Sequence, residues 1–172
     1  MRIREAKPRD ARAVAKVQVD TWKSTYSDIV PDKVLNKMTY ESRAKQWRSI
    51  ISNQMVYVAE DEFGTIIGFA NASEQRLSEY SDYEAELYAM YILDEYQRMG
   101  IGKQLLEPIV DELVRKEMHS MTVLVLEENE SREFYESLGG KEIDRVEIEL
   151  LDQKLNEIVY GWEDIREIEL GH

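Results

Sequence analysis

The chain has 172 residues, of which 43% are hydrophobic and 33% are charged, a composition typical of a folded domain rather than a disordered segment. We expect one domain over residues 1–172, because this length fits one core and leaves little room for a second. The formal net charge is −13. This charge disfavours nucleic acid and anionic membrane surfaces as partners, because both require a basic protein surface.

The residue types that are missing exclude several kinds of chemistry. The chain has no cysteine, which excludes disulfides, thiolate zinc sites and an acyl-cysteine intermediate. Apart from the last residue, His119 is the one histidine, so we expect no metal centre. No run of about 18 apolar residues is present, and the start lacks a secretory signal pattern. We therefore expect a cytoplasmic protein.

The first half of the chain predicts a strand, a helical region and a β-hairpin. An apolar stripe at helical spacing follows Pro8 and is interrupted over residues 24–31. A turn signal at residues 61–64 separates two β-forming runs. In chain order, we expect a strand at 2–5, a helix from about 8, short helices around 34–38 and 44–51, and hairpin strands at 55–59 and 65–72.

The second half predicts a strand–helix–strand unit, a short helix and an antiparallel strand pair. Pro108 lies inside the long helix, where we expect a kink, or alternatively a helix that ends and restarts. The expected elements are a strand at 86–93, a helix over about 101–113, a strand at 121–126 buried on both faces, a helix at 131–138 and two strands joined around 152–154. This order predicts a mixed α/β sheet covered by helices, with a right-handed crossover between two parallel strands.

Two glycines at the start of the long helix indicate an anion site. Gly100 and Gly102 let a ligand approach backbone amides that have no partner at a helix start, and Arg98 and Lys103 add positive charge. The Rossmann pattern fails here because it lacks its third glycine, and the P-loop pattern lacks its first glycine and its hydroxyl residue. A tight turn without a ligand remains the alternative.

Three segments in order resemble the GNAT superfamily of N-acetyltransferases. Residues 97–102 are similar to its Q/R-x-x-G-x-G/A turn, residues 85–92 to its fourth strand, and residues 129–135 to its signature of an asparagine, a small residue and a Phe-Tyr pair. The resemblance covers nearly the whole chain. It implies a mostly antiparallel mixed sheet of about seven strands, with a splayed central parallel pair and four to five flanking helices.

The resemblance also implies acetyl-CoA as the acyl donor. Its pyrophosphate would bind the amides of the glycine turn, its pantetheine arm would pair with the strand edge, and a strand amide would polarise the thioester carbonyl. The implied donor-binding residues are Met90, Tyr91, Ile92, Gln97, Arg98, Met99, Gly100, Ile101, Gly102, Lys103, Asn129 and Tyr135. For Asn129, a role at the start of the following helix is an alternative that is compatible with donor binding.

Two residues match the family's catalytic positions. Glu86 matches its carboxylate base, with Glu84 as a weaker substitute, and a solvent-facing glutamate is the alternative. Tyr135 matches the tyrosine that protonates the leaving thiolate, and an aromatic residue that only packs in the core is the alternative. Because cysteine is absent, we expect direct attack of the amine within a ternary complex.

The acceptor is less well defined by the sequence. Residues 21–31 resemble an S/T-W-x-x-x-Y-x-x-I-x-P stretch of many bacterial GNAT proteins. Trp22 and Tyr26 could wall the acceptor pocket with Tyr88 opposite, or could pack in the core. The surplus of carboxylates favours a small cationic amine, such as a polyamine or an amino sugar, or a peptide amine. A non-catalytic acyl-CoA-binding module and a nucleotide-binding domain remain alternatives, and the closing strands could form a homodimer edge.

Overall fold

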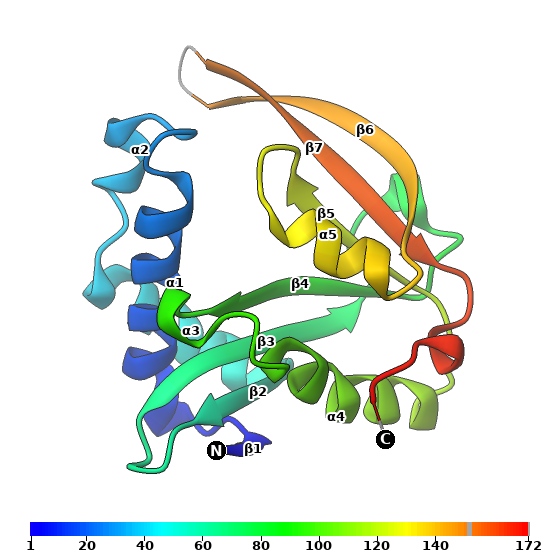
Figure 1. The fold of residues 1–172 in the computed structure, drawn as a ribbon, viewed down its shortest axis with the longest axis horizontal. Coiled ribbons are helices and arrows are strands. Elements are labelled where there is room, and N and C mark those ends of the chain that lie inside the picture. Colours follow the sequence, from blue (N-terminus) through cyan, green and yellow to red (C-terminus); the bar gives the residue numbers. More distant parts are fainter. Residues whose placement is uncertain (151–152, 172) are drawn as a thin grey trace.

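The structure, a computed structural model, describes residues 1–150 and 153–171 and contains a seven-stranded mixed sheet. The strand order is β1-β2-β3-β4-β5-β7-β6, and helices cover both faces (Figure 1). β4 and β5 are the parallel pair, and the other neighbours are antiparallel. The predicted fold class is therefore confirmed.

The helices and strands follow the predicted order. The strands are β1 (Arg2–Glu5), β2 (Met55–Glu60), β3 (Ile66–Glu74), β4 (Ala85–Ile92), β5 (Met121–Leu126), β6 (Lys141–Leu150) and β7 (Gln153–Trp162). The helices are α1 (Ala11–Tyr26), α2 (Asp32–Leu35), α3 (Tyr40–Asn53), α4 (Ile101–Arg115) and α5 (Ser131–Ser137). The predicted turn around residue 152 falls partly on residues 151 and 152, which lie outside the described residues.

Three helices differ in length from the prediction. α1 continues to Tyr26, three residues into the stretch where the apolar pattern breaks. α3 has 14 residues rather than being short, because the Thr39 side chain caps its start by accepting a hydrogen bond from the Ser42 amide at 3.1 Å. α4 runs through Pro108 without a break, so the alternative of a helix that ends and restarts is wrong. Burial of the apolar face of α4 offsets the cost of the proline, which is about 3 kcal/mol.

Two apolar clusters hold the helices on opposite faces of the sheet. On one face α4 and α5 pack on the sheet through residues such as Leu105, Ile109 and Tyr135. On the other face α1 and α3 pack through Val14 and Trp47 on β2 and β3. We call these the α4 face and the α1 face. Side chains of each central strand alternate between them.

The central parallel pair is short. β4 pairs with β5 over Ala85–Leu87 alone, although β4 continues to Ile92 alongside β3. The register between β3 and β4 shifts at the same point, where Tyr88 is an extra residue between the pairs formed by Leu87 and Ala89. Such a bulge bends a strand. From Tyr88 onward, the edge of β4 that faces β5 therefore has no strand partner among the described residues, which is the predicted splay.

The closing hairpin packs back on the sheet through Trp162. A side-chain Cβ at Gly140 would lie 2.8 Å from the Trp162 ring and 2.8 Å from the Tyr135 carbonyl oxygen. The indole Nε1 of Trp162 donates to the Leu138 carbonyl at 3.0 Å. Glycine at position 140 therefore leaves room for the Trp162 ring.

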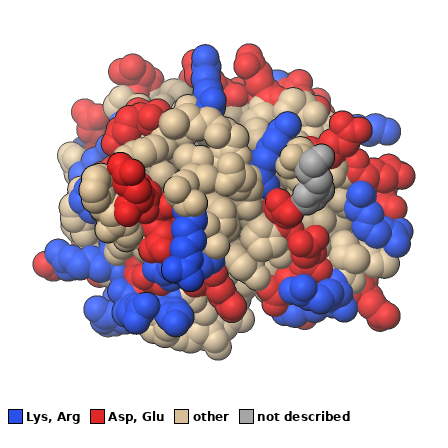
Figure 2. Space-filling view, turned by 60° about the horizontal axis from the view of Figure 1, so that its bottom comes forward, with Lys and Arg blue, Asp and Glu red and all other residues tan. Residues whose placement is uncertain are grey.

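The net charge does not form a single acidic surface on the face drawn in Figure 2. There, acidic and basic side chains are interspersed around a central area of uncharged residues. No described helix is long and apolar enough to cross a membrane.

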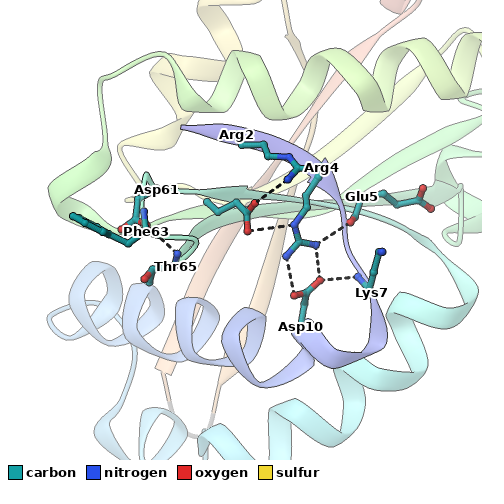
Figure 3. A network of polar contacts seen from close by, with 9 residues as sticks. Arg2, Arg4, Glu5, Lys7, Asp10, Asp61, Phe63 and Thr65 are labelled. Atoms are coloured by element: carbon teal, nitrogen blue, oxygen red, sulfur yellow. Dashed lines mark hydrogen bonds and ion pairs between the residues drawn. The ribbon is translucent and has the colours of Figure 1, made fainter.

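An ionic network fixes the first strand to the first helix. The Arg4 guanidinium donates to both Asp10 carboxylate oxygens at 2.8 and 3.0 Å, and its Nε lies 3.3 Å from Glu60 (Figure 3). The Lys7 amide donates to Asp10 at 2.8 Å. The Arg4 and Asp10 side chains are both largely buried. Hydrogen bonding from Arg4 lowers the pKa of Asp10 below its ordinary value, with burial opposing it.

Replacing Asp10 by asparagine tests this network. Because the pKa of Asp10 is lowered in the folded state, its contribution is present above the unfolded-state pKa and is lost as the pH falls through the folded value. We expect D10N to lower the free energy of unfolding by about 1–3 kcal/mol at pH 7 and by less in acid, as measured by urea unfolding. E147Q, which removes a carboxylate from an exposed ion pair, should change it by less than about 1 kcal/mol. Equal losses in both variants would contradict the account.

Candidate active site

The turn before α4 presents a row of free amides. Gly100 adopts a left-handed conformation with φ +81°, and Arg98 does so with φ +63°. Within the described part of the chain, the N–H groups from Arg98 to Lys103 have no hydrogen-bond acceptor. They lie at the positive end of a 15-residue helix. The arrangement suits a phosphate or pyrophosphate group.

Close packing of two helices fixes this turn. A Cβ at Gly102 would lie 2.9 Å from the Phe134 ring, so the glycine allows α5 to approach the first turn of α4. The Gln97 side chain donates to the Ile92 carbonyl at 3.0 Å and thereby links the end of β4 to the turn. The Arg98 guanidinium lies 3.8 Å from Glu130 at an exposed position, and Met99 is exposed.

The unpaired edge of β4 leads from this turn into the sheet. Met90 and Ile92 pack on the α4 face, whereas Tyr91 packs on the α1 face. The Tyr91 ring centroid lies 5.7 Å from that of Phe69 and 6.5 Å from that of Trp22. The backbone of this segment is therefore open on one side while its side chains are anchored on both faces.

Tyr135 lies on α5 and is 4% exposed. Its ring packs against Phe134, Tyr160 and Trp162. No residue that the structure describes forms a hydrogen bond with its hydroxyl group. Burial, and secondarily Tyr91, raise its pKa, so the phenol stays protonated at neutral pH.

Asn129 links the two sides of the splayed pair. Its Nδ2 donates to the Tyr26 hydroxyl at 2.6 Å, and its Oδ1 accepts from the Ser131 amide at 2.9 Å. The second contact supports the predicted alternative, a role at the start of the following helix. The first contact joins α1 to the segment after β5. Burial raises the pKa of Tyr26 above its ordinary value.

Glu86 is buried rather than solvent-facing, so the solvent-facing alternative is wrong. It is 1% exposed, and both its carboxylate oxygens accept hydrogen bonds from Arg76, at 3.0 and 2.8 Å. The Arg76 guanidinium also lies 4.1 Å from the centroid of the Tyr88 ring. Arg76 lines an open hollow of about 660 Å³ formed by the connection from β3 to β4 and by Lys116 and Met118 after α4. Arg76 was not predicted, because no pattern in a loop shows which acid an arginine meets.

The predicted acceptor aromatics separate into two groups. Trp22 and Tyr26 lie together with ring centroids 4.5 Å apart, and the third ring beside Trp22 is Tyr91. The Trp22 indole N–H is buried without a partner among the described residues. Tyr88 instead packs under Arg76, and its hydroxyl donates to the Glu74 carbonyl.

β7 adds a carboxylate that the sequence analysis did not single out. Glu157 is half-buried and lies opposite Leu126 in the register of β5 and β7. Burial, and then the charge of Glu86, raise its pKa. The alternation of Leu155, Glu157 and Val159 could have indicated a glutamate on an apolar face. We find no group of three or more potential metal ligands in the described ranges.

Comparison with known proteins identifies the family. Residues 22–140 match the model of the acetyltransferase (GNAT) family. The chain belongs to this family. It is 39% identical over 163 residues to the uncharacterized N-acetyltransferase YuaI of Bacillus subtilis, covering 95% of this chain and 93% of YuaI. It is also 38% identical over 61 residues to the ribosomal protein bS18-alanine N-acetyltransferase of Haemophilus influenzae, covering 36% and 42% of the two chains.

Solved structures share the fold. A PaiA N-acetyltransferase from Thermoplasma acidophilum in complex with coenzyme A has a TM-score of 0.71, with 22% identity over 93% of this chain and 96% of that one. YncA, a putative acetyltransferase of Salmonella typhimurium with acetyl-CoA, has a TM-score of 0.72, with 20% identity over 94% and 92%.

A pair of glycine substitutions separates donor binding from stability. Gly100 and Gly64 share left-handed φ values of +81° and +82°, and neither has a neighbour within 4 Å of an added Cβ. G100A and G64A should therefore each cost about 1–2 kcal/mol of stability. We expect only G100A to weaken acetyl-CoA binding, by about tenfold in calorimetric titration, because it moves the free amides. Equal affinity in both variants would show that the turn is structural only.

Proposed function

We propose that this protein transfers an acetyl group from acetyl-CoA to a primary amine by direct attack in a ternary complex. The observation that carries the proposal is the unpaired edge of β4, which runs directly into a row of free amides before α4. This arrangement offers hydrogen-bond donors to a phosphate at one end and a strand edge to an amide-containing chain at the other. Two proteins of the same fold, PaiA and YncA, have been solved with coenzyme A and with acetyl-CoA, which supports this choice of donor.

The residues present fit this donor. The amides from Arg98 to Lys103 would hold its pyrophosphate, and the backbone at Met90, Tyr91 and Ile92 would pair with its pantetheine arm. The Asn129 amide group is already engaged with Tyr26 and would contact the arm only alongside that bond. Acetyl-CoA supplies an electrophilic thioester carbonyl when it is bound.

The transfer requires two proton movements. A free alkylammonium group has a pKa near 10, so a base must take its proton before nitrogen can attack. Two carboxylates on the α1 face of the sheet are candidates for this base, Glu86 as the sequence predicts and Glu157. The leaving thiolate needs a proton, and Tyr135 is the candidate acid because its phenol stays protonated and its hydroxyl is free of partners in the described structure.

We propose an acceptor that is a small cationic amine, such as a polyamine or an amino sugar, or a peptide amine. The support is local, because the carboxylates of Glu86 and Glu157 lie on the same face as the Trp22, Tyr26 and Tyr91 rings. Aromatic faces and carboxylates together suit a cation. The bS18-alanine relative, named for a peptide amine substrate, covers only a third of this chain.

Replacing Tyr135 by phenylalanine tests whether its hydroxyl protonates the leaving thiolate. We expect Y135F to lower kcat by about 10–100-fold while the acetyl-CoA dissociation constant changes little, because the ring packing is kept and only the proton donor is lost. Y57F is the matched control, since the Tyr57 hydroxyl donates to Glu112 in the last turns of α4, away from the β4 edge. An unchanged kcat in Y135F would leave Tyr135 a packing residue.

A further inference from the structure

Both oxygens of Glu86 are already engaged in the structure. Arg76 donates to each of them, and the pair is held further by the stacking of Arg76 on Tyr88. A carboxylate in a bidentate ion pair with arginine is stabilised in its charged form and is geometrically fixed. Protonation of Glu86 would remove the negative charge that pairs with Arg76, in a site from which solvent is nearly excluded. The geometry therefore disfavours Glu86 as the group that takes the amine proton.

Glu157 lies on the same face of the sheet as Glu86. Leu155, two residues earlier on β7, packs with Tyr26 of α1, while its neighbour Ile158 packs on the α4 face. Strand alternation therefore directs Glu157 toward the α1 face, where Glu86 lies beside Thr122. Within the residues described, the Glu157 carboxylate forms no hydrogen bond and no ion pair.

The register neighbours of Glu157 on the adjacent strands are apolar. Its register partners on β5 and β6 are Leu126 and Val146, which carry no charge. The charged or titratable groups that interact electrostatically with Glu157 are Glu86 and Tyr91 on β4, Arg76 and Tyr80 before β4, and Tyr26 on α1. Glu157 therefore lies at the point where α1, β4 and β7 face one another, next to the gap in the β4–β5 pair.

We propose that Glu157 is the carboxylate that binds the acceptor's ammonium group and takes its proton, and that Glu86 with Arg76 is a positioning pair. This inference rests on the proposed function. In the step, an N–H bond of the ammonium breaks and an O–H bond forms on Glu157, which leaves a lone pair on the neutral amine. That nitrogen attacks the thioester carbonyl carbon and the C–S bond breaks. Tyr135 gives its proton to the departing sulfur, and the second amine proton restores the Tyr135 phenol. Glu157 then releases its proton to solvent.

The raised pKa of Glu157 fits this role. Burial raises it first and the Glu86 charge second, while Arg76 lowers it. A base whose pKa lies closer to neutrality transfers a proton more readily than an ordinary carboxylate. Glu86 thus acts through Glu157, because its fixed negative charge makes the neighbouring carboxylate more basic.

Isosteric variants of three glutamates separate these roles. The experiment measures kcat/KM against pH for the wild type, E157Q, E86Q and E149Q, with acetyl-CoA and a panel containing a polyamine, an amino sugar and a peptide with a free N-terminus. A given amine has the same pKa with every enzyme variant, so differences between the pH profiles come from the enzyme. We expect E157Q to lower kcat/KM by about a hundredfold and to abolish the acidic limb of the profile, which is the fall of kcat/KM toward low pH. E86Q should move that limb to lower pH without abolishing it. E149Q, on the exposed side of the neighbouring strand, should match the wild type.

The contrary results are distinct. If E86Q abolishes the acidic limb and E157Q keeps it, Glu86 is the base and the inference is wrong. If E157Q matches the wild type on every accepted amine, Glu157 has no role and the proposed function still stands. If the wild type binds acetyl-CoA but accepts no amine of the panel, the proposed function fails and the inference fails with it.

Stability separates a functional glutamate from a structural one. A carboxyl group with a raised folded-state pKa favours the folded state below the unfolded-state pKa, and this contribution is lost as the pH rises through the folded value. At pH 7 the ionised Glu157 is therefore a cost, and we expect E157Q to melt at the same temperature as the wild type or higher. Lower activity together with a lower melting temperature would make Glu157 structural and would overturn the inference.

Discussion

The site depends on one constraint: the parallel pairing between β4 and β5 stops early. β4 and β5 share three residues of register, and a bulge at Tyr88 then bends β4 away while each strand stays paired on its other side. Backbone groups that lose a strand partner must find another, because an unpaired polar group away from water is costly. The exposed edge of β4 and the free amides before α4 therefore both require hydrogen-bond partners. One elongated ligand with a phosphate end supplies partners to both.

Packing on both faces keeps this opening rigid. Gly102 lets Phe134 approach α4, and Trp162 occupies the space above Gly140, so α5 and β7 are held on one side of the gap. On the other side, the bond from Asn129 to Tyr26 joins α1 to the end of β5. Burial of the phenols Tyr26, Tyr91 and Tyr135 around the gap keeps them protonated. The same walls that exclude water raise the pKa of Glu157, so the fold that opens the strand pair also adjusts the chemistry beside it.

The sequence predicts the parts of this site that depend on local order. The β4 run, the glycine turn and the α4 stripe are contiguous, so periodicity and turn chemistry were sufficient to place them. The continuous passage of α4 through Pro108 was not predictable, because it depends on how much apolar surface the sheet offers. Arg76, Tyr91 and Glu157 come from a loop, a strand and a distant hairpin. Their meeting on the α1 face follows from sheet order and register, which no local pattern in the chain contains.

Thermal melting with acetyl-CoA tests most directly whether the gap between β4 and β5 is a donor site. The account predicts a clear rise in melting temperature with acetyl-CoA, which corresponds to about 2.7 kcal/mol at a hundredfold excess over the dissociation constant. Free CoA should produce a rise as well, because the amides and the strand edge recognise the part that the two molecules share. No shift at millimolar acetyl-CoA would contradict the account and would make the turn at Gly100 a purely structural start of α4.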